Sequence, residues 1–208
     1  MMGTLEVRVT RVLLALVTVT SVACARRTDL MDYRATAGVD IDPPGPGRAV
    51  VVFVRPDGRA KFVSSTIFDD VAPVAVLMQK TYAVYDTPAG KHRFMVVSEA
   101  ADFMDANLDE GKVYFARIAD RMGAWRARFS LLPVSPHDEK WKDLGEWMND
   151  SDARRVTLNA AGRTWAQDNA PSIQKKHDAY LPKWLAKRDR PTLYPTDGIR
   201  LQDLRDLM

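Results

Sequence analysis

Between residues 48 and 134, apolar residues recur in short runs that turn residues separate. The first run, residues 49–54, is apolar without alternation, which is typical of a strand buried on both faces. Further strands are predicted at residues 61–68, 74–77, 81–85, 92–97, 113–118 and 125–131. Because no helical pattern separates these strands, we predict an antiparallel β-sandwich or barrel and not a parallel α/β sheet.

After residue 134 the pattern becomes helical. Ser135 can cap a helix and Pro136 fits its first position, and a helical face follows with Trp141, Leu144 and Met148.

Beyond that helix, residues 155–158 predict one more short strand, and Asn159 can cap the next helix. Helical spacing continues past Pro171 and Pro182, which predicts a kinked helix or two consecutive helices. Residues 199–208 predict a short terminal helix, so residues 135–208 are interpreted as a helical C-terminal extension.

The N-terminus has the pattern of an export signal. Arg8 and Arg11 precede an apolar run, residues 12–23, that is shorter than the about 20 residues of a transmembrane helix. Ser21-Val22-Ala23-Cys24 then resembles a bacterial lipobox, although Ser21 stands where leucine is usual. We therefore expect residues 1–23 to be a lipoprotein signal peptide and Cys24 to be lipidated.

Two other interpretations of this segment remain open. Ala23-Cys24-Ala25 also fits an ordinary signal-peptidase site, and the segment could be an uncleaved anchor. Lipidation is favoured because Cys24 is the only cysteine, and an exported chain with one cysteine cannot form an internal disulfide. Ala25 after the cysteine resembles an outer-membrane address, which predicts a location in the bacterial envelope facing the periplasm.

A Pro/Gly-rich segment, residues 42–47, links this N-terminus to the strands. Such a segment is extended and cannot join a helix or a central strand, so residues 24–47 are predicted to be a tether. The predicted organisation is thus residues 1–23 signal peptide, 24–47 lipidated tether, 48–134 sandwich and 135–208 helical extension.

Composition limits the function. The 208 residues are 46% hydrophobic, which fits one globular domain with a core, or a small domain with an appendage, and the net charge is only +3. No long basic block follows the N-terminus, so nucleic-acid binding is not predicted.

Three short motifs carry a family resemblance. They are Val51-Val52-Phe53-Val54-Arg55, the turn Pro88-Ala89-Gly90-Lys91-His92 after Tyr82 and Tyr85, and Gly111-Lys112-Val113-Tyr114-Phe115. Residues 48–132 thereby resemble the bacterial lipoprotein family catalogued as domain of unknown function 2846. The resemblance implies an immunoglobulin-like or transthyretin-like sandwich and no catalytic residues.

Catalytic motifs are weak. His92 fits a turn position with a local hydrogen bond, and His137 and His177 stand at no metal-ligand spacing. There is no Gly-x-Ser-x-Gly. The candidate carboxylates all fall at apparent turns; they are Asp69-Asp70, Asp102 and Asp105, and Asp109-Glu110. No cofactor or metal is predicted.

Two groups of residues are candidates for binding. Arg126 and Arg128 share one face of a predicted strand, with Arg117 just before, and this stripe could bind a lipid phosphate, a glycan carboxylate or an acidic partner. The alternative is a solvated sheet face. Trp165 and Trp184 either dock the helices onto the sandwich or form a partner- or membrane-facing surface.

We therefore expect a non-enzymatic envelope lipoprotein that acts as an interaction or accessory module. Its expected partners are the membrane, through the lipid anchor, and another envelope protein or an anionic envelope polymer. Two alternatives are a glycan- or lipid-acting hydrolase with a site between sandwich and tail, and a structural subunit of an envelope assembly.

Overall fold

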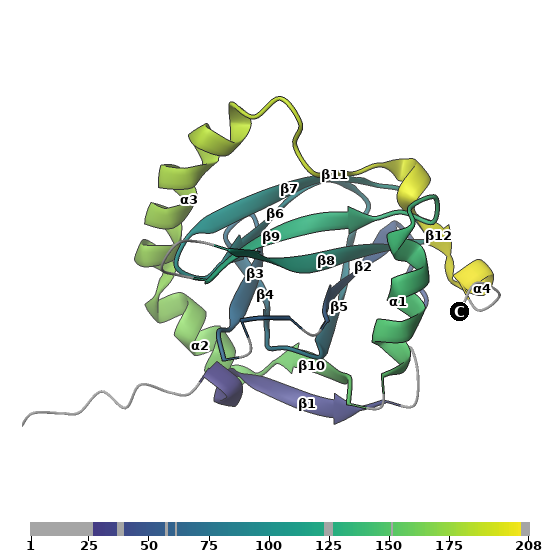
Figure 1. Ribbon diagram of the computed structural model, residues 1–208, viewed down its shortest axis with the longest axis horizontal. Coiled ribbons are helices and arrows are strands. Elements are labelled where there is room, and N and C mark those ends of the chain that lie inside the picture. The colour runs from purple at the N-terminus through teal and green to yellow at the C-terminus, as the bar shows by residue number, and fades with distance from the viewer. Residues whose placement is uncertain are drawn as a thin grey trace, which may run out of the picture.

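The computed structural model describes residues 27–36, 40–56, 58–60, 62–122, 127–150 and 152–204. Cys24, the predicted signal peptide and Arg126 lie outside these described residues. The protein is mainly β, as predicted, with helices on two sides (Figure 1).

One sheet of the described chain has seven strands, six of them in the order β1-β10-β5-β2-β8-β12, and β9 pairs with β8 as well. Its strands are β1 (Met31–Ala35), β2 (Arg48–Arg55), β5 (Thr81–Pro88), β8 (Lys112–Met122), β9 (Ala127–Val134), β10 (Arg154–Leu158) and β12 (Ile199–Arg200). The second sheet has the order β11-β7-β6-β3-β4. Its strands are β3 (Ser65–Asp69), β4 (Ala72–Leu77), β6 (Gly90–Val97), β7 (Ala101–Leu108) and β11 (Thr192–Leu193).

Both sheets are mixed, which corrects the prediction of a purely antiparallel sandwich. β2 pairs in parallel with β8, β10 with β5, and β11 with β7, whereas the other pairs are antiparallel. The chain leaves β2 for two strands of the other sheet, returns as β5, leaves again and returns as β8. These long excursions supply the crossover that a parallel pair needs, without a helix.

The core lies in three layers. One cluster fills the space between the sheets and includes Val51 and Phe53, while Val52 and Val54 on the opposite face of β2 pack in a second cluster with the helix α1 (Lys140–Asn149). The prediction that this strand is buried on both faces is confirmed. A third cluster joins the outer face of the other sheet to the helix α3 (Ala170–Leu185).

The segment predicted to be a tether contains part of the fold. Residues 27–30 form the short helix η1 (Arg27–Leu30), and β1 pairs antiparallel with β10 along its whole length. Leu30 and Met31 are buried in the core between the sheets. Because their side chains remove apolar surface from water, this stretch is held in the sandwich.

The C-terminal third is interleaved with the sandwich. β10, β11 and β12 each join a sheet. α1 precedes β10, and α2 (Ala160–Asp168), α3 and the short η2 (Pro195–Asp197) lie between these strands, whereas α4 (Leu201–Leu204) follows β12. The predicted strand at residues 155–158 is confirmed. The predicted cap is also confirmed, because the Asn159 side chain accepts a hydrogen bond from the Gly162 N–H. None of the described helices is long and apolar enough to cross a membrane.

The first predicted helix begins later than expected. α1 begins at Lys140 and not beside Ser135. The Ser135 hydroxyl and the Asp138 carboxylate instead accept hydrogen bonds from the His137 and Lys140 N–H groups, which holds residues 135–139 in turns.

Candidate functional site

The structure separates the residues of the predicted arginine stripe. Arg128 in β9 lies opposite Arg121 in β8, near the connected end of this hairpin, whereas Arg117 lies opposite Leu132. Four strand positions, about 13 Å, separate Arg117 from Arg121. Arg126 is outside the described residues. The predicted stripe is therefore divided between two sites. Arg128 lines one hollow and Arg117 lines another.

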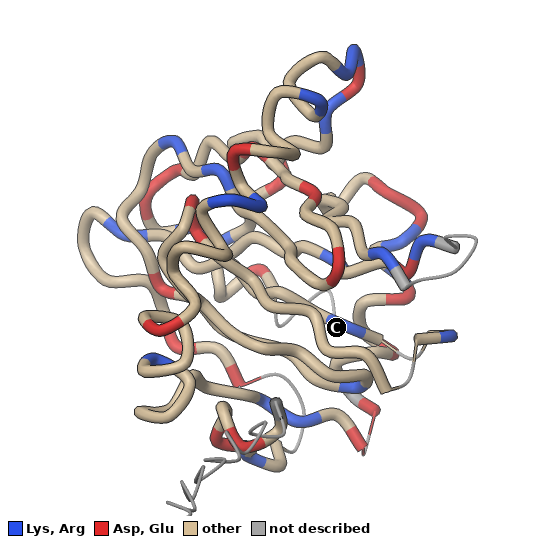
Figure 2. Tube along the Cα trace, turned by 90° about the vertical axis from the view of Figure 1, so that its left-hand side faces the viewer, with Lys and Arg blue, Asp and Glu red and all other residues tan. Residues whose placement is uncertain are grey.

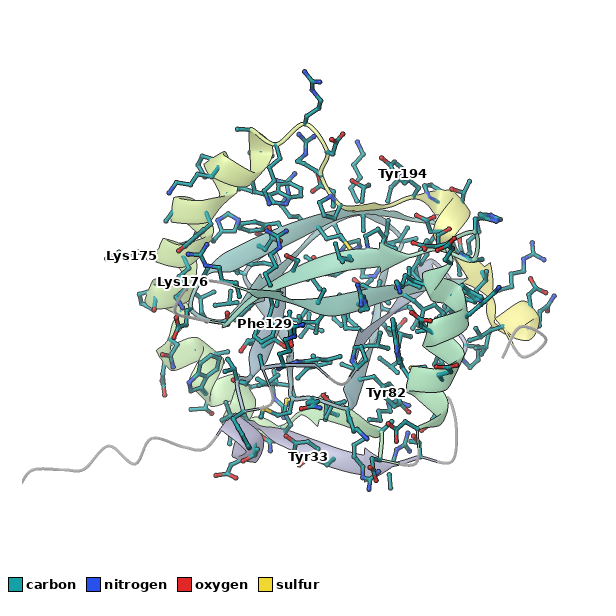
Figure 3. The ribbon with its side chains drawn as sticks, viewed as in Figure 1. Tyr33, Tyr82, Phe129, Lys175, Lys176 and Tyr194 are labelled. Atoms are coloured by element: carbon teal, nitrogen blue, oxygen red, sulfur yellow. The ribbon has the colours of Figure 1, made fainter. Side chains whose placement is uncertain are left out.

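The first hollow brings together two of the predicted residues, Arg128 and Trp184. It has a volume of about 150 Å³ and lies between the β8–β9 hairpin, the start of β7 and the end of α3. Phe129, labelled in Figure 3, and Tyr180 contribute to its wall. Its charged residues are Asp102, Arg121, Arg128, Lys183 and Lys187, and we call the hollow they line the basic notch.

Asp102 is the single carboxylate among the described residues that line the basic notch. Its side chain is 9% exposed, and its Oδ2 atom lies 3.0 Å from the Arg121 guanidinium. Lys187 donates a hydrogen bond of 3.0 Å to its Oδ1. A buried carboxylate is stable only when it is paired, and here the hairpin and the segment after α3 each supply one cation. Asp102 thus joins these two elements at the start of β7.

The other two cations of the notch are unmatched. Arg128 and Lys183 are both exposed, and neither forms an ion pair with another described residue. The Lys183 ammonium lies 5.8 Å from the centre of the Tyr180 ring. Four cations therefore surround one carboxylate. Figure 2 shows acidic and basic residues interspersed over this side of the molecule, so the notch is a local excess of positive charge.

Trp184 forms the base of the notch. Its side chain is 2% exposed, and the guanidinium groups of Arg93 and Arg190 each lie 5.5 Å from its ring centre. Its indole Nε1 is buried and has no hydrogen-bond partner among the described residues, although a buried indole N–H usually finds an acceptor. This position agrees with the docking interpretation, because Trp184 packs α3 onto Phe103 of β7.

Trp165 lies elsewhere. It is half-buried in α2 and packs against both the inter-sheet cluster and the cluster under α3. It does not line the basic notch. The structure therefore does not bring the two predicted tryptophans into one surface.

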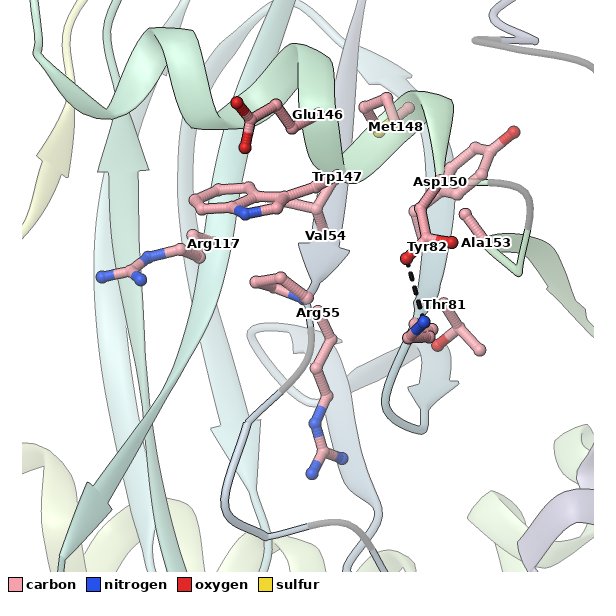
Figure 4. A pocket seen from close by; sticks show the side chains of 12 residues that line it. Val54, Arg55, Thr81, Tyr82, Arg117, Glu146, Trp147, Met148, Asp150 and Ala153 are labelled. Carbon is pink, nitrogen blue, oxygen red and sulfur yellow. Dashed lines mark ion pairs between the residues drawn. The ribbon is translucent and has the colours of Figure 1, made fainter.

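The hollow beside Arg117 is larger, about 390 Å³, and lies between the end of α1, the end of β2, the start of β5 and the middle of β8 (Figure 4). The Arg117 guanidinium lies 5.5 Å from the centre of the Trp147 ring, beside Glu146. On the opposite wall Lys80 and Asp150 form an ion pair of 3.0 Å. The described lining has three cations and two carboxylates, against four cations and one carboxylate in the notch, so its excess of positive charge is smaller.

Arg55 also borders this hollow, but its guanidinium turns away from Trp147 (Figure 4). It is 3% exposed and donates to the carbonyls of Leu77 and Ala60 at 2.8 and 2.9 Å. Burial lowers the pKa of Arg55 to about 10, so it stays charged at neutral pH. Arg55 therefore closes one end of the inter-sheet core and is not free to bind a ligand.

His92 has the structural role that its turn position predicts. Its Nδ1 lies 2.7 Å from Oδ2 of Asp69 and its Nε2 lies 2.9 Å from the Pro88 carbonyl. The hydrogen bond to Asp69, and then the one to Pro88, raise the pKa of the imidazole. His92 borders a hollow that also holds Asp70 and Asp105, but both of its ring nitrogens are already engaged.

His177 packs edge-on against Phe103, and it lies 3.2 Å from Asp70 and 2.9 Å from Asp178. Within the described ranges, no three His, Cys, Asp or Glu side chains come together as a metal site would require.

Sequence reasoning missed the acidic centre of the notch. Asp102 was expected at a turn, whereas it lies on β7. A partial signal was available, because Lys183 and Lys187 stand four residues apart beside Trp184. The sequence could not show that these lysines face the end of the β8–β9 hairpin.

No family model matches this chain, and a search of the curated proteins finds no match.

Proposed function

We propose that the protein is a non-enzymatic lipoprotein of the bacterial envelope, attached to a membrane through Cys24 and acting as an interaction or accessory module. The signal-like N-terminus, the lipobox-like residues before Cys24 and the absence of any other cysteine support this. The resemblance of residues 48–132 to a bacterial lipoprotein family agrees with it.

The basic notch supports the binding part of the proposal. Arg128 and Lys183 are unmatched cations beside a carboxylate that two further cations already neutralise. A hollow with an excess of one sign of charge and apolar walls concentrates oppositely charged groups. Guanidinium and ammonium donors together suit a phosphate or carboxylate with several acceptor oxygens. The ligand we propose is therefore an anionic group of an envelope molecule.

The chemistry of the notch favours binding over hydrolysis. The described residues that line it include no histidine, serine or cysteine, and their one carboxylate is held by Arg121 and Lys187. A general base must be able to accept a proton from the reacting group, and an ion-paired Asp102 is poorly suited to that role.

Attachment is tested by mass spectrometry of the mature N-terminus from bacterial membranes. We expect a chain that begins at Cys24 and carries diacylglyceryl and acyl groups, and we expect Cys24→Ser to abolish the modification. A mature chain that begins unmodified at Ala25 or Arg26 would contradict the anchor.

Anion binding is tested by calorimetric titration with inorganic phosphate, glycerol phosphate and glucuronate. The chain is compared with the double variant Arg128→Gln/Lys183→Gln. A matched control, Lys142→Gln/Arg200→Gln, removes two exposed cations from α1 and β12, on the opposite side of the molecule (Figure 1). We expect binding by the unaltered chain and the control, and a loss of at least tenfold in the notch variant. If no anion binds the unaltered chain, the notch is not an anion site.

A further inference from the structure

A second hollow adjoins the basic notch across the turn between β6 and β7. It has a volume of about 660 Å³. Ser98 and Glu99 in this turn line the second hollow, and the next residues, Ala100 and Ala101, line the notch. Both hollows therefore open at the same end of the second sheet.

Phe62 stands on the rim of the second hollow with its side chain 94% exposed. It is the most exposed large apolar residue of the described chain. Full exposure of an aromatic ring to water is unfavourable, whereas such rings are common on surfaces that enter the interface of a bilayer. This observation is independent of the charges in the notch.

Thr28 in η1 lines the same hollow as Phe62. Thr28 is four positions after Cys24 in the sequence, and a fully extended chain of that length spans at most about 14 Å. A lipid on Cys24 would hold this end of the domain against the bilayer surface. In Figure 1, η1, α3 and the end of the β8–β9 hairpin all lie on the left of the molecule.

We propose that this end of the domain rests on the membrane, with Phe62 in the lipid interface and Arg128 and Lys183 on the phosphates of lipid headgroups. The proposal rests on the Cys24 anchor and the anion-binding notch proposed above, and it names their shared ligand as phospholipid. Basic residues close to an anionic surface each strengthen its binding, and an inserted ring adds apolar burial.

Vesicle sedimentation tests the headgroup contact. The protein is the chain from residue 24 with Cys24→Ser, which retains every described residue and cannot bind through an acyl chain. Vesicles contain phosphatidylcholine with or without phosphatidylglycerol. We expect binding only to the anionic vesicles, about thirtyfold weaker for Arg128→Gln/Lys183→Gln, which corresponds to about 2 kcal/mol. Lys142→Gln/Arg200→Gln should bind like the unaltered chain.

The outcomes separate this proposal from the function on which it rests. If Arg128→Gln/Lys183→Gln no longer binds inorganic phosphate but still binds vesicles fully, the anion site is supported and the headgroup contact is wrong. If all three chains bind anionic vesicles equally, the headgroup contact is also wrong. If the mature N-terminus is unmodified while the notch variant still loses vesicle binding, the anchor is wrong and the headgroup contact stands.

Photo-crosslinking tests the orientation. We place p-benzoylphenylalanine at position 62 or, as a control, at position 194, because Tyr194 is also an exposed aromatic residue, 59% exposed, and lies on the opposite side (Figure 3). Illumination on the anionic vesicles should attach lipid at position 62 and not at position 194. Equal attachment at both positions, or attachment at position 194 alone, would contradict the orientation.

Discussion

His92 places both nitrogens of its imidazole against acceptor oxygens, those of Asp69 and Pro88. The protonated ring can donate to both, so folding raises its pKa above the ordinary value. A group whose pKa is higher in the folded state contributes its full stabilisation of the fold at pH values below its unfolded pKa. That contribution is lost as the pH rises through the raised folded pKa.

We therefore expect the free energy of unfolding to fall as the pH is raised from below about 6.5 through the raised pKa of His92. Urea unfolding across this range measures the slope for the unaltered chain and for His92→Gln. The variant should lose this part of the slope, and Asp69→Asn should reduce it as well. A slope that is unchanged in both variants would show that another group causes it.

At the scale of elements, α2 approaches η1 so closely that only glycine fits between them. A Cβ on Gly162 would lie 2.3 Å from the Leu30 carbonyl oxygen and 2.5 Å from a methyl group of Leu158. Because the carbonyl belongs to the backbone, it cannot move aside as a flexible side chain would. This contact fixes α2 against the N-terminal segment.

Gly162→Ala should therefore destabilise the protein by about 1–3 kcal/mol, despite the better helix propensity of alanine. Gly145→Ala in α1 is the matched control, because its Cβ would meet no atom within 4 Å. This control should stabilise by about 0.5–1 kcal/mol. Urea unfolding of both variants measures the difference, and a stabilising Gly162→Ala would disprove the close contact.

The docking of α3 depends on Trp184. It packs on Phe103, and its side chain is 2% exposed, whereas its neighbour Leu185 is 43% exposed. Trp184→Ala should lower the free energy of unfolding by about 3–5 kcal/mol. Leu185→Ala should change it by no more than about 0.5 kcal/mol. Equal effects in urea unfolding would contradict the docking of α3 through this side.

At the scale of the whole molecule, the N-terminal segment is part of the sandwich. A chain that begins at Asp40 would lose β1 and the buried side chains of Leu30 and Met31. Each of these side chains contributes about 1.5–3 kcal/mol when buried. We expect this chain to unfold at lower urea concentration than one that begins at Arg26, and amides of β10 to exchange faster with solvent. Equal midpoints would mean that the segment acts as a tether only.

Local sequence patterns were sufficient to predict several of the strands and helices. The unbroken apolar run that became β2 encodes burial on two faces, and Asn159 encodes its helix start through one short-range hydrogen bond. The strand β7 was missed, because its sequence is rich in Asp, Asn and Ala, which are depleted in strands. Its Asp102 and Asp105 are stabilised by ion pairs with Arg121 and Arg93, which come from other elements.

The sequence by itself determined that the chain is mainly β and that a strand and helices follow residue 134. It also contains the lipobox-like signal at Cys24. These features depend on neighbours in the chain, so a local pattern carries them. Only the tertiary structure decided that β1 belongs to the sandwich, that its sheets are mixed, and that Arg128, Lys183 and Asp102 line one hollow. Those features depend on pairing between segments far apart in the chain, which no local pattern specifies.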